Sequence, residues 1–146
     1  MTAEASQRPP VGLLDTNAVI LLPRIQSPEH LPNEPTISTI TLAELSVGPL
    51  VARSDSERAA RQAQLQQAEA DFDPIAFDAA AARAFGRVAA DLRRSGRKTS
   101  ARAYDALIAA VAVANDLPLY TANPKDFDGI DDLDVVSIPV PAQTDA

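Results

Sequence analysis

Short apolar runs alternate with longer segments of helical periodicity along most of this chain. Continuous or alternating apolar residues predict strands at residues 11–15, 36–40, 74–77, 117–121 and 135–138. Segments that repeat an apolar residue every three or four positions lie between these runs. Strands that alternate with helices predict an α/β fold, a three-layer α/β/α sandwich around a mostly parallel central sheet of about five strands.

Capping residues and helix-forming composition predict the intervening helices. Asp15 and Asp78 each precede a segment of apolar periodicity, and each can cap a helix that begins just after it. Further helices are predicted through residues 42–47, at 56–71, where Ala, Gln, Arg and Glu predominate, and at 103–115. The last of these is apolar over nearly one whole side, which is typical of a helix that packs on a sheet.

The two ends of the chain differ from its middle. Residues 11–138 are expected to form a single domain, preceded by a disordered segment at 1–10 and followed by a C-terminal tail at 139–146. The first ten residues are polar and contain a proline pair, so they do not resemble a signal peptide. No apolar run approaches membrane-spanning length, and we expect a cytoplasmic protein that has no membrane partner.

Charge is distributed unevenly along the sequence. The formal net charge of −7 at pH 7 argues against non-specific nucleic-acid binding by the whole surface. Basic residues nevertheless predominate at 83–102, and aspartates predominate at 116–134. One segment could therefore approach phosphates while the other holds cations. The absence of cysteine excludes disulfides and thiolate metal sites.

Asp15 lies inside the apolar run at residues 11–22. An ionised carboxylate in an apolar core must be hydrogen-bonded, paired or bound to a metal. Capping of the next helix is the structural alternative, and it still leaves an oxygen free for a ligand. Asp15 also ends the first predicted strand, and ligands of such sheets bind beyond the carboxyl ends of the strands. This position therefore predicts a functional site.

Three further acidic positions are candidates for the same site. Asp105 is the only acid in the apolar helix at 103–114, and it shares a face with core-like alanines. Glu44 lies in an apolar helical turn, where an exposed position on an amphipathic helix is the alternative. After the fourth predicted strand, either Asn123 or Asp126 could supply a fourth oxygen, although this segment is also typical of a simple turn.

Grouped carboxylates point to a hard divalent cation. They repel one another unless a cation lies nearby, and Mg²⁺ prefers carboxylate and water oxygens. A bound ion can lower the pKa of a water molecule and neutralise charge on a phosphate. We therefore interpret four acids as both the metal-binding and the catalytic residues: Asp15, Glu44, Asp105 and Asp126. Neighbouring polar residues are expected to support them: Thr16, Asn17, Thr121 and Asn123.

Four segments in this order resemble the motifs of a PIN domain, and more narrowly those of the VapC ribonuclease toxins. They are Leu13–Asn17, Ile40–Leu45, Tyr104–Ala112 and Leu119–Phe127. The resemblance covers about residues 11–138 and implies that the acids bind Mg²⁺ or Mn²⁺. It implies an endoribonuclease that is the toxin of a type II toxin–antitoxin pair, with a small VapB-type antitoxin protein as partner and a homodimeric assembly.

An acidic protein that cleaves RNA needs basic side chains near its site. Several such residues directly precede the helix that carries Asp105, and clustered arginines are typical of phosphate contacts. The alternative is a solvated helix end, where basic residues interact favourably with the helix dipole. RNA contacts are predicted for five residues: Arg93, Arg94, Arg97, Lys98 and Arg102.

Two other functions fit parts of the pattern. A phosphatase of the haloacid dehalogenase type would use Asp15 as a covalent nucleophile, although Asn17 replaces the second acid of its motif and the chain is short for that fold. A non-catalytic module whose acids hold a structural cation would use the same residues. Cleavage of DNA also fits, because PIN-like folds include DNA nucleases.

Overall fold

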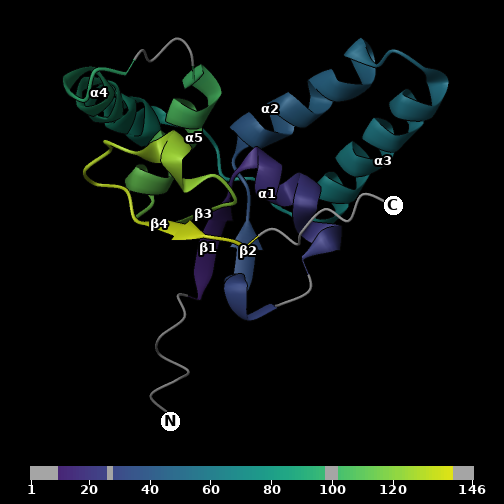
Figure 1. Ribbon diagram of the computed structural model, residues 1–146, viewed down its shortest axis with the longest axis horizontal. Helices are drawn as coiled ribbons and strands as arrows, with labels where there is room; N and C mark the ends of the chain where they lie inside the picture. The colour runs from purple at the N-terminus through teal and green to yellow at the C-terminus, as the bar shows by residue number, and fades with distance from the viewer. Residues whose placement is uncertain (1–9, 26–27, 98–101, 140–146) are drawn as a thin grey trace.

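The central feature of the structure is a small sheet in which every strand pair is parallel (Figure 1). This computed structural model describes residues 10–25, 28–97 and 102–139. Within these ranges the sheet has four strands in the order β2-β1-β3-β4. Their bounds are β1 Val11–Leu14, β2 Glu34–Thr36, β3 Leu119–Thr121 and β4 Val135–Ser137. Most of the predicted terminal segments at 1–10 and 139–146, and Lys98, lie outside the described residues.

Two strand predictions need correction. The strand predicted at 36–40 ends at Thr36, because Ser38 caps the next helix and its Oγ accepts the Thr41 N–H at 3.3 Å. The segment at 74–77 forms only an isolated bridge, in which Ile75 pairs with Ser38. The described part of the chain therefore contains four strands where about five were expected.

Four of the five α-helices in the described ranges begin after a residue whose side chain caps them, and α5 is the exception. Asp15 and Asp78 both cap, as expected, and Ser54 accepts the Glu57 N–H at 3.1 Å to cap a third helix. The α-helices are α1 Thr16–Leu21, α2 Thr39–Val47, α3 Asp55–Asp71, α4 Ala79–Arg94 and α5 Ala103–Ala114. Short 3₁₀ segments are η2 Leu22–Arg24, η3 Pro28–His30, η4 Gly48–Val51 and η6 Pro124–Phe127.

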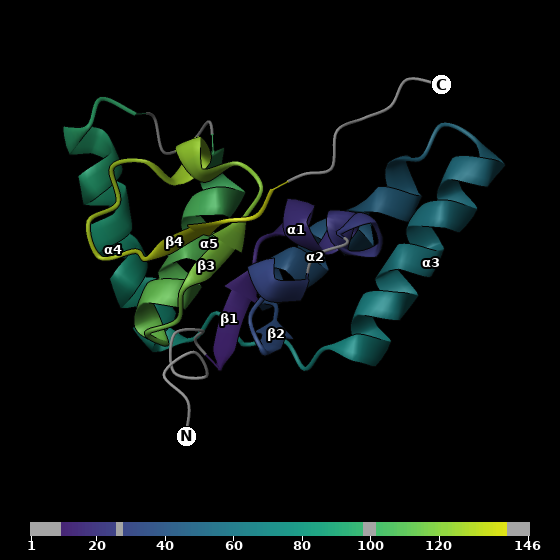
Figure 2. The ribbon, with the colours of Figure 1, turned by 60° about the horizontal axis from the view of Figure 1, so that its bottom comes forward.

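The sheet separates two apolar cores, as a three-layer sandwich requires. Leu13 and Leu119 belong to the core that is completed by α4 and α5. Their chain neighbours Leu14 and Tyr120 point to the opposite face and pack with Ala18 of α1. Both views place α4 and α5 on one side of the sheet and α2 and α3 on the other (Figure 2). The predicted α/β/α architecture is therefore confirmed.

None of the helices in the described ranges combines the length and the apolar composition needed to cross a bilayer.

The pairing of β1 with β3 determines where the functional side chains meet. Leu14 lies opposite Tyr120, and the Asp15 N–H donates to the Tyr120 carbonyl at 3.2 Å. The two strands are parallel, so Asp15 and Thr121 emerge at the same edge of the sheet. The first and fourth predicted strands are therefore neighbours in the sheet.

Gly12 provides a test of this packing, because β1 passes very close to its neighbours there. A Cβ atom at position 12 would lie 2.5 Å from Cε1 of Tyr120 and 2.9 Å from Cβ of Pro32. We expect Gly12→Ala to lower the free energy of unfolding by about 1–3 kcal/mol, the usual cost of overpacking. Urea denaturation measures this change.

Gly86→Ala is the matched control, because Gly86 lies within α4 and a Cβ atom there would meet nothing beyond its own helix within 4 Å. This change should raise the stability by about 0.5–1 kcal/mol through helix propensity. Equal stability of Gly12→Ala and the wild type would contradict the described packing of β1 against Tyr120.

Candidate functional site

Asp15 joins the ends of β1 and β3 and is almost fully buried. Its Oδ1 accepts the Ala18 N–H at 2.8 Å, and its Oδ2 accepts the Thr121 hydroxyl at 2.6 Å. Burial raises the pKa of Asp15, the two hydrogen bonds lower it, and the charge of Asp126 raises it. The two bonds fix the orientation of the carboxylate, and each oxygen keeps a lone pair for a further ligand.

Glu44 on α2 is half-buried and is bonded to the first residue of α1. Its Oε1 accepts the Thr16 hydroxyl at 2.6 Å. Thr16 Oγ1 also lies 3.0 Å from Thr41 Oγ1. Because Thr16 has one hydroxyl proton and donates it to Glu44, the Thr41 hydroxyl is the donor in this second bond. Glu44 is thus tied to the residue that follows Asp15 rather than extended into solvent.

Asp105 lies in the first turn of α5, and the charges of all three other acids affect its pKa. Its pKa is raised to about 6, first by burial and then by the charges of Asp126, Asp15 and Glu44. The positive charge of Arg102 acts in the opposite direction. The four acidic side chains come from four separate parts of the chain, and the other three lie within electrostatic range of Asp105.

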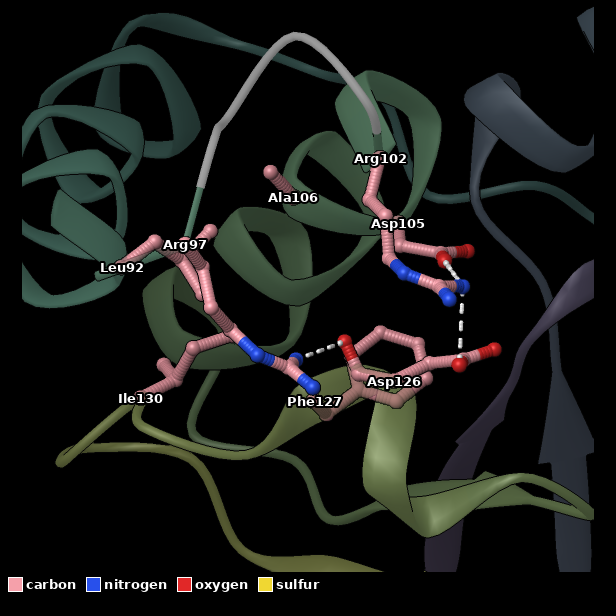
Figure 3. A pocket seen from close by; sticks show the side chains of 8 residues that line it. All are labelled: Leu92, Arg97, Arg102, Asp105, Ala106, Asp126, Phe127 and Ile130. Carbon is pink, nitrogen blue, oxygen red and sulfur yellow. Dashed lines mark hydrogen bonds and ion pairs between the residues drawn. The ribbon is translucent and has the colours of Figure 1, made fainter. Parts of the chain in front are cut away.

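Arg102 lies between two of these acids. Its Nη1 is 2.8 Å from Oδ1 of Asp126 and 3.7 Å from Oδ2 of Asp105 (Figure 3). Within residues 10–25, 28–97 and 102–139, no three acidic or imidazole side chains are arranged so that they could hold a metal ion in this conformation. In this conformation the guanidinium of Arg102 supplies the positive charge between the carboxylates of Asp105 and Asp126.

The donor atoms nevertheless fit a divalent cation in type. All four candidate side chains offer carboxylate oxygens, which Mg²⁺ and Mn²⁺ prefer. The raised pKa of Asp105 marks a position where added positive charge is favourable. Binding of an ion by three carboxylates would require side-chain movement, and Arg102 is the residue that already occupies the gap.

The predicted supporting residues divide into two groups. Thr16 and Thr121 donate directly to Glu44 and Asp15, and the Thr121 hydroxyl also accepts the Asn123 N–H at 3.0 Å. Asn17 is exposed and lines a groove between α1, α2 and α3. Four of the residues on this surface are Thr16, Asn17, Ile20 and Glu44.

The geometry favours Asp126 over Asn123 as the residue that supplies the fourth side-chain oxygen of the site. The carboxylate of Asp126 is bonded to Arg102 and raises the pKa of both Asp15 and Asp105. Asn123 is exposed, and its carbonyl accepts the Asp126 N–H at 3.0 Å. Asn123 therefore contributes backbone contacts that position η6.

The predicted RNA-binding arginines have different surroundings. Arg93 is exposed, and Arg97 donates to the Asp126 carbonyl at 3.2 Å. Arg102 and Arg94 are engaged with carboxylates, so neither is unpaired in this conformation. Arg97 and Arg102 both lie at the acidic site, whereas Arg94 belongs to a separate group of charges.

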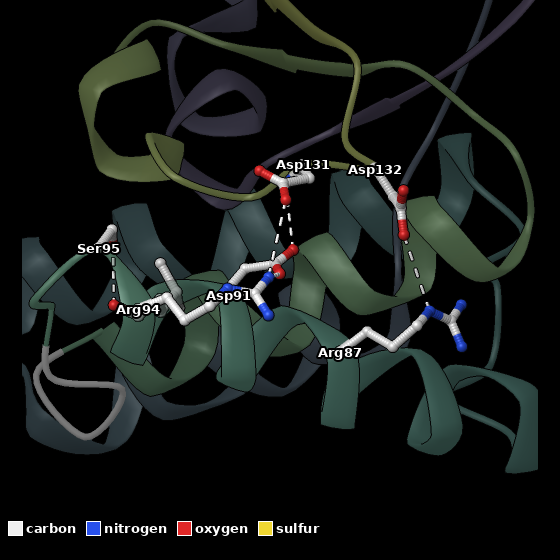
Figure 4. Close-up of polar contacts among 7 residues, drawn as sticks. Arg87, Asp91, Arg94, Ser95, Asp131 and Asp132 are labelled. Carbon is white, nitrogen blue, oxygen red and sulfur yellow. Dashed lines mark hydrogen bonds and ion pairs between the residues drawn. The ribbon is translucent and has the colours of Figure 1, made fainter.

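That second group was not found from the sequence. Asp91 is buried on α4, pairs with Arg94, and accepts the Asp131 N–H at 3.1 Å (Figure 4). Arg87 and Asp132 add a longer ion pair at 3.8 Å (Figure 4). These contacts tie the loop before β4 to α4. One sequence signal for this second group of charges was the position of Asp91, which lies on the apolar stripe of its helix three residues after the core residue Val88.

The PIN domain family model matches residues 13–133 of the chain. This chain belongs to the PIN domain family. The chain is 36% identical over 128 residues to ribonuclease VapC5 of Mycobacterium tuberculosis. This alignment covers 86% of this chain and 92% of that protein. A 33% identity over 102 residues relates it to ribonuclease VapC4 of the same organism, across 70% of this chain and 75% of the relative.

Solved structures agree with the fold of this PIN domain. A VapBC-5 structure from M. tuberculosis, a member of the VapBC family of toxin–antitoxin systems, superposes with a TM-score of 0.77 at 34% identity. The match covers 89% of this chain and 100% of that chain. VapBC2 from Rickettsia felis, bound to a DNA fragment from its promoter, gives a TM-score of 0.70 at 25% identity, over 86% and 96% of the two chains.

Family membership separates the alternatives that the sequence left open. The haloacid dehalogenase-like alternative depended on the motif that begins at Asp15, and this motif lies inside the PIN domain match. Asn17, which would take the place of the second acid, is exposed. The phosphatase alternative therefore has no support beyond that partial motif.

The raised pKa of Asp105 predicts a pH-dependent stability in the absence of metal. The unfolded chain releases this proton near pH 4 and the folded protein near pH 6, so the folded state holds more protons between these values. Stability should therefore fall as pH rises through this window, by at most about 3 kcal/mol. Urea denaturation in EDTA from pH 4 to 7.5 measures the loss.

Asp105→Asn should lack this loss of stability. Its free energy of unfolding should therefore be closest to that of the wild type near pH 4 and should rise relative to the wild type as pH increases. Asp55→Asn is the control, because Asp55 is fully exposed at the start of α3. Parallel stability curves for Asp105→Asn and the wild type would show that neither burial nor the other acids raise the pKa of Asp105 in the folded protein.

Proposed function

We propose that this PIN domain is a divalent-metal-dependent endoribonuclease and the toxin of a type II toxin–antitoxin pair. The observation that carries the proposal is the convergence of Asp15, Glu44, Asp105 and Asp126 beside the carboxyl ends of β1 and β3, where Arg102 lies between two of the acids. Relatives named ribonuclease VapC support the choice of RNA as substrate.

The four acids would hold Mg²⁺ or Mn²⁺. When bound, such an ion activates water and neutralises charge that develops on the scissile phosphate. Asp15 and Asp105 would bind it directly, and Asp126 would complete the site. Glu44 would be a further ligand or would orient the attacking water. Direct carboxylate ligands and retained water molecules are typical of Mg²⁺ sites.

Hydrogen bonds within the protein would keep this site ordered. Thr121 holds Asp15, and Thr16 holds Glu44, so neither carboxylate is free to rotate away from the edge of the sheet. Such supporting bonds orient ligands and affect both metal affinity and activity. The cap bond from Ala18 gives Asp15 a second constraint.

Basic residues beside the acids would contact the RNA backbone. Arg97 and Arg102 lie at the site itself, and Arg93 is exposed at the end of α4. In this proposal Arg102 exchanges its carboxylate partners for a phosphate when an ion neutralises Asp105 and Asp126. Guanidinium groups suit this exchange because they bind carboxylate and phosphate oxygens with similar geometry.

The partner in this proposal is a VapB-type antitoxin protein, because related structures are VapBC complexes. Apolar side chains near the groove beside Glu44 support a protein partner: Val47, Leu50 and Val51 are all exposed, and Leu50 is 84% exposed. Homodimerisation and a cytoplasmic location follow from the same family assignment and belong to this proposal.

Cleavage of single-stranded RNA by purified protein tests the proposed function. We expect cleavage with Mg²⁺ or Mn²⁺ and none in EDTA. Asp15→Asn and Asp105→Asn should each lower the cleavage rate by more than about 100-fold, because each removes charge from the ion's ligands. Asp55→Asn changes an exposed aspartate on α3 and should cleave like the wild type.

Equal cleavage by the wild type and both site variants, in preparations shown to be free of contaminating nuclease, would contradict the proposal. A DNA strand of the same sequence distinguishes ribonuclease from deoxyribonuclease activity. Ion binding without cleavage of either strand would instead favour a module that holds a structural cation.

A further inference from the structure

A partly open cavity of about 160 Å³ lies directly beside the acidic site (Figure 3). Its apolar wall comes from α4, α5 and the segment around η6, and consists of Leu92, Ala106, Phe127 and Ile130. Each of these four residues is at most 8% exposed. The remaining lining side chains are charged: Arg97, Arg102, Asp105 and Asp126. We call this feature the side cavity.

The apolar wall has no use in holding a cation or a phosphate. Both of those ligands need polar or charged groups around them. The side cavity is also continuous with the acids, because Asp105 and Asp126 line it. A ligand of the site should therefore carry a compact apolar part next to its phosphate.

In RNA, the parts with large apolar faces are the bases. A base that has left its stack presents two such faces together with polar edges. Leu92 and Phe127 offer apolar contact inside the cavity, and the arginines that line it offer hydrogen-bond donors. Single-strand recognition commonly combines these two kinds of contact.

Arg97 is placed to contact a base in this position. One of its N–H groups donates to the Asp126 carbonyl, which holds the guanidinium beside the cavity (Figure 3). The guanidinium has further donors and a planar face that can stack on a base. Its place next to Asp126 puts such a base adjacent to a phosphate bound at the acids.

We propose that the side cavity binds one unstacked base of single-stranded RNA, from a nucleotide that adjoins the scissile phosphate. The inference rests on the proposed ribonuclease function and adds a base-binding subsite to it. A base must leave its stack to enter, so the cavity would favour single strands over a continuous duplex.

An apolar side chain of a protein partner fits this cavity less well. It would fill the part lined by Leu92 and Phe127 but would offer no partner to the N–H groups of Arg97 and Arg102 that Asp105 and Asp126 leave unused. Loss of water from such donors without a new hydrogen bond is costly. The edge of a base offers both donors and acceptors to these groups.

An abasic nucleotide provides the test. A 12-nucleotide single-stranded RNA with one mapped cleavage site is compared with copies that lack one base, either beside the cleaved bond or four nucleotides away. We expect wild-type cleavage to fall about tenfold or more when the adjacent base is absent, as for loss of one stacked base. Removal of the distant base should have little effect.

A filled cavity should remove this dependence. Ala106→Leu places a larger side chain in the cavity, and we expect it to cleave the intact and adjacent-abasic RNAs at similar rates. Ala103→Leu is the matched control, because Ala103 is exposed on the same helix and should keep the wild-type ratio. The wild-type comparison needs no variant, so it decides the matter even if Ala106→Leu does not fold.

Equal wild-type cleavage of the intact and adjacent-abasic RNAs would overturn the base subsite while leaving the ribonuclease function in place. An Ala106→Leu protein that binds its antitoxin poorly but keeps the wild-type abasic ratio would assign the cavity to that partner and overturn the inference. A wild-type protein that cleaves no RNA would overturn the proposed function and the subsite with it.

Discussion

Repulsion among four carboxylates that are partly or almost fully buried is the constraint on which the site depends. The parallel pairing of β1 with β3 brings Asp15 to an edge of the sheet that α2, α5 and η6 also reach. Each ionised acid there makes ionisation of Asp105 harder. The fold can tolerate this charge only by adding hydrogen bonds and positive groups around it.

The surrounding residues supply both kinds of compensation. Thr121 and Thr16 donate short hydrogen bonds to Asp15 and Glu44, and Arg102 pairs with Asp126. The threonine bonds fix positions, whereas the arginine pair is half-exposed and can be exchanged. The same arrangement thus compensates the carboxylate charge in part and leaves a site that an added cation would stabilise.

Much of this arrangement could be predicted from the sequence, because strand ends and helix caps are local signals. Asp15 and Asp78 marked helix starts, and Asp15 also marked the end of the first strand. The adjacency of β1 and β3 did not follow from the sequence, because the alternation of strands and helices leaves the strand order open. The predicted strand at 36–40 was wrong in its bounds, because alternation of polar and apolar residues also occurs where the chain leads from β2 to the helix cap at Ser38. The pairing of Arg102 with Asp126 was not predictable. The two residues are 24 positions apart, and the sequence does not show which of several acids an arginine contacts.

Crystallography of the protein soaked with Mn²⁺ tests the central claim most directly. Anomalous scattering locates the ion independently of any activity. The account predicts a peak bounded by the carboxylates of Asp15 and Asp105, and loss of that peak in Asp15→Asn. Manganese found only at other surface acids, or an unchanged peak in the variant, would contradict the claim that these carboxylates form one cation site.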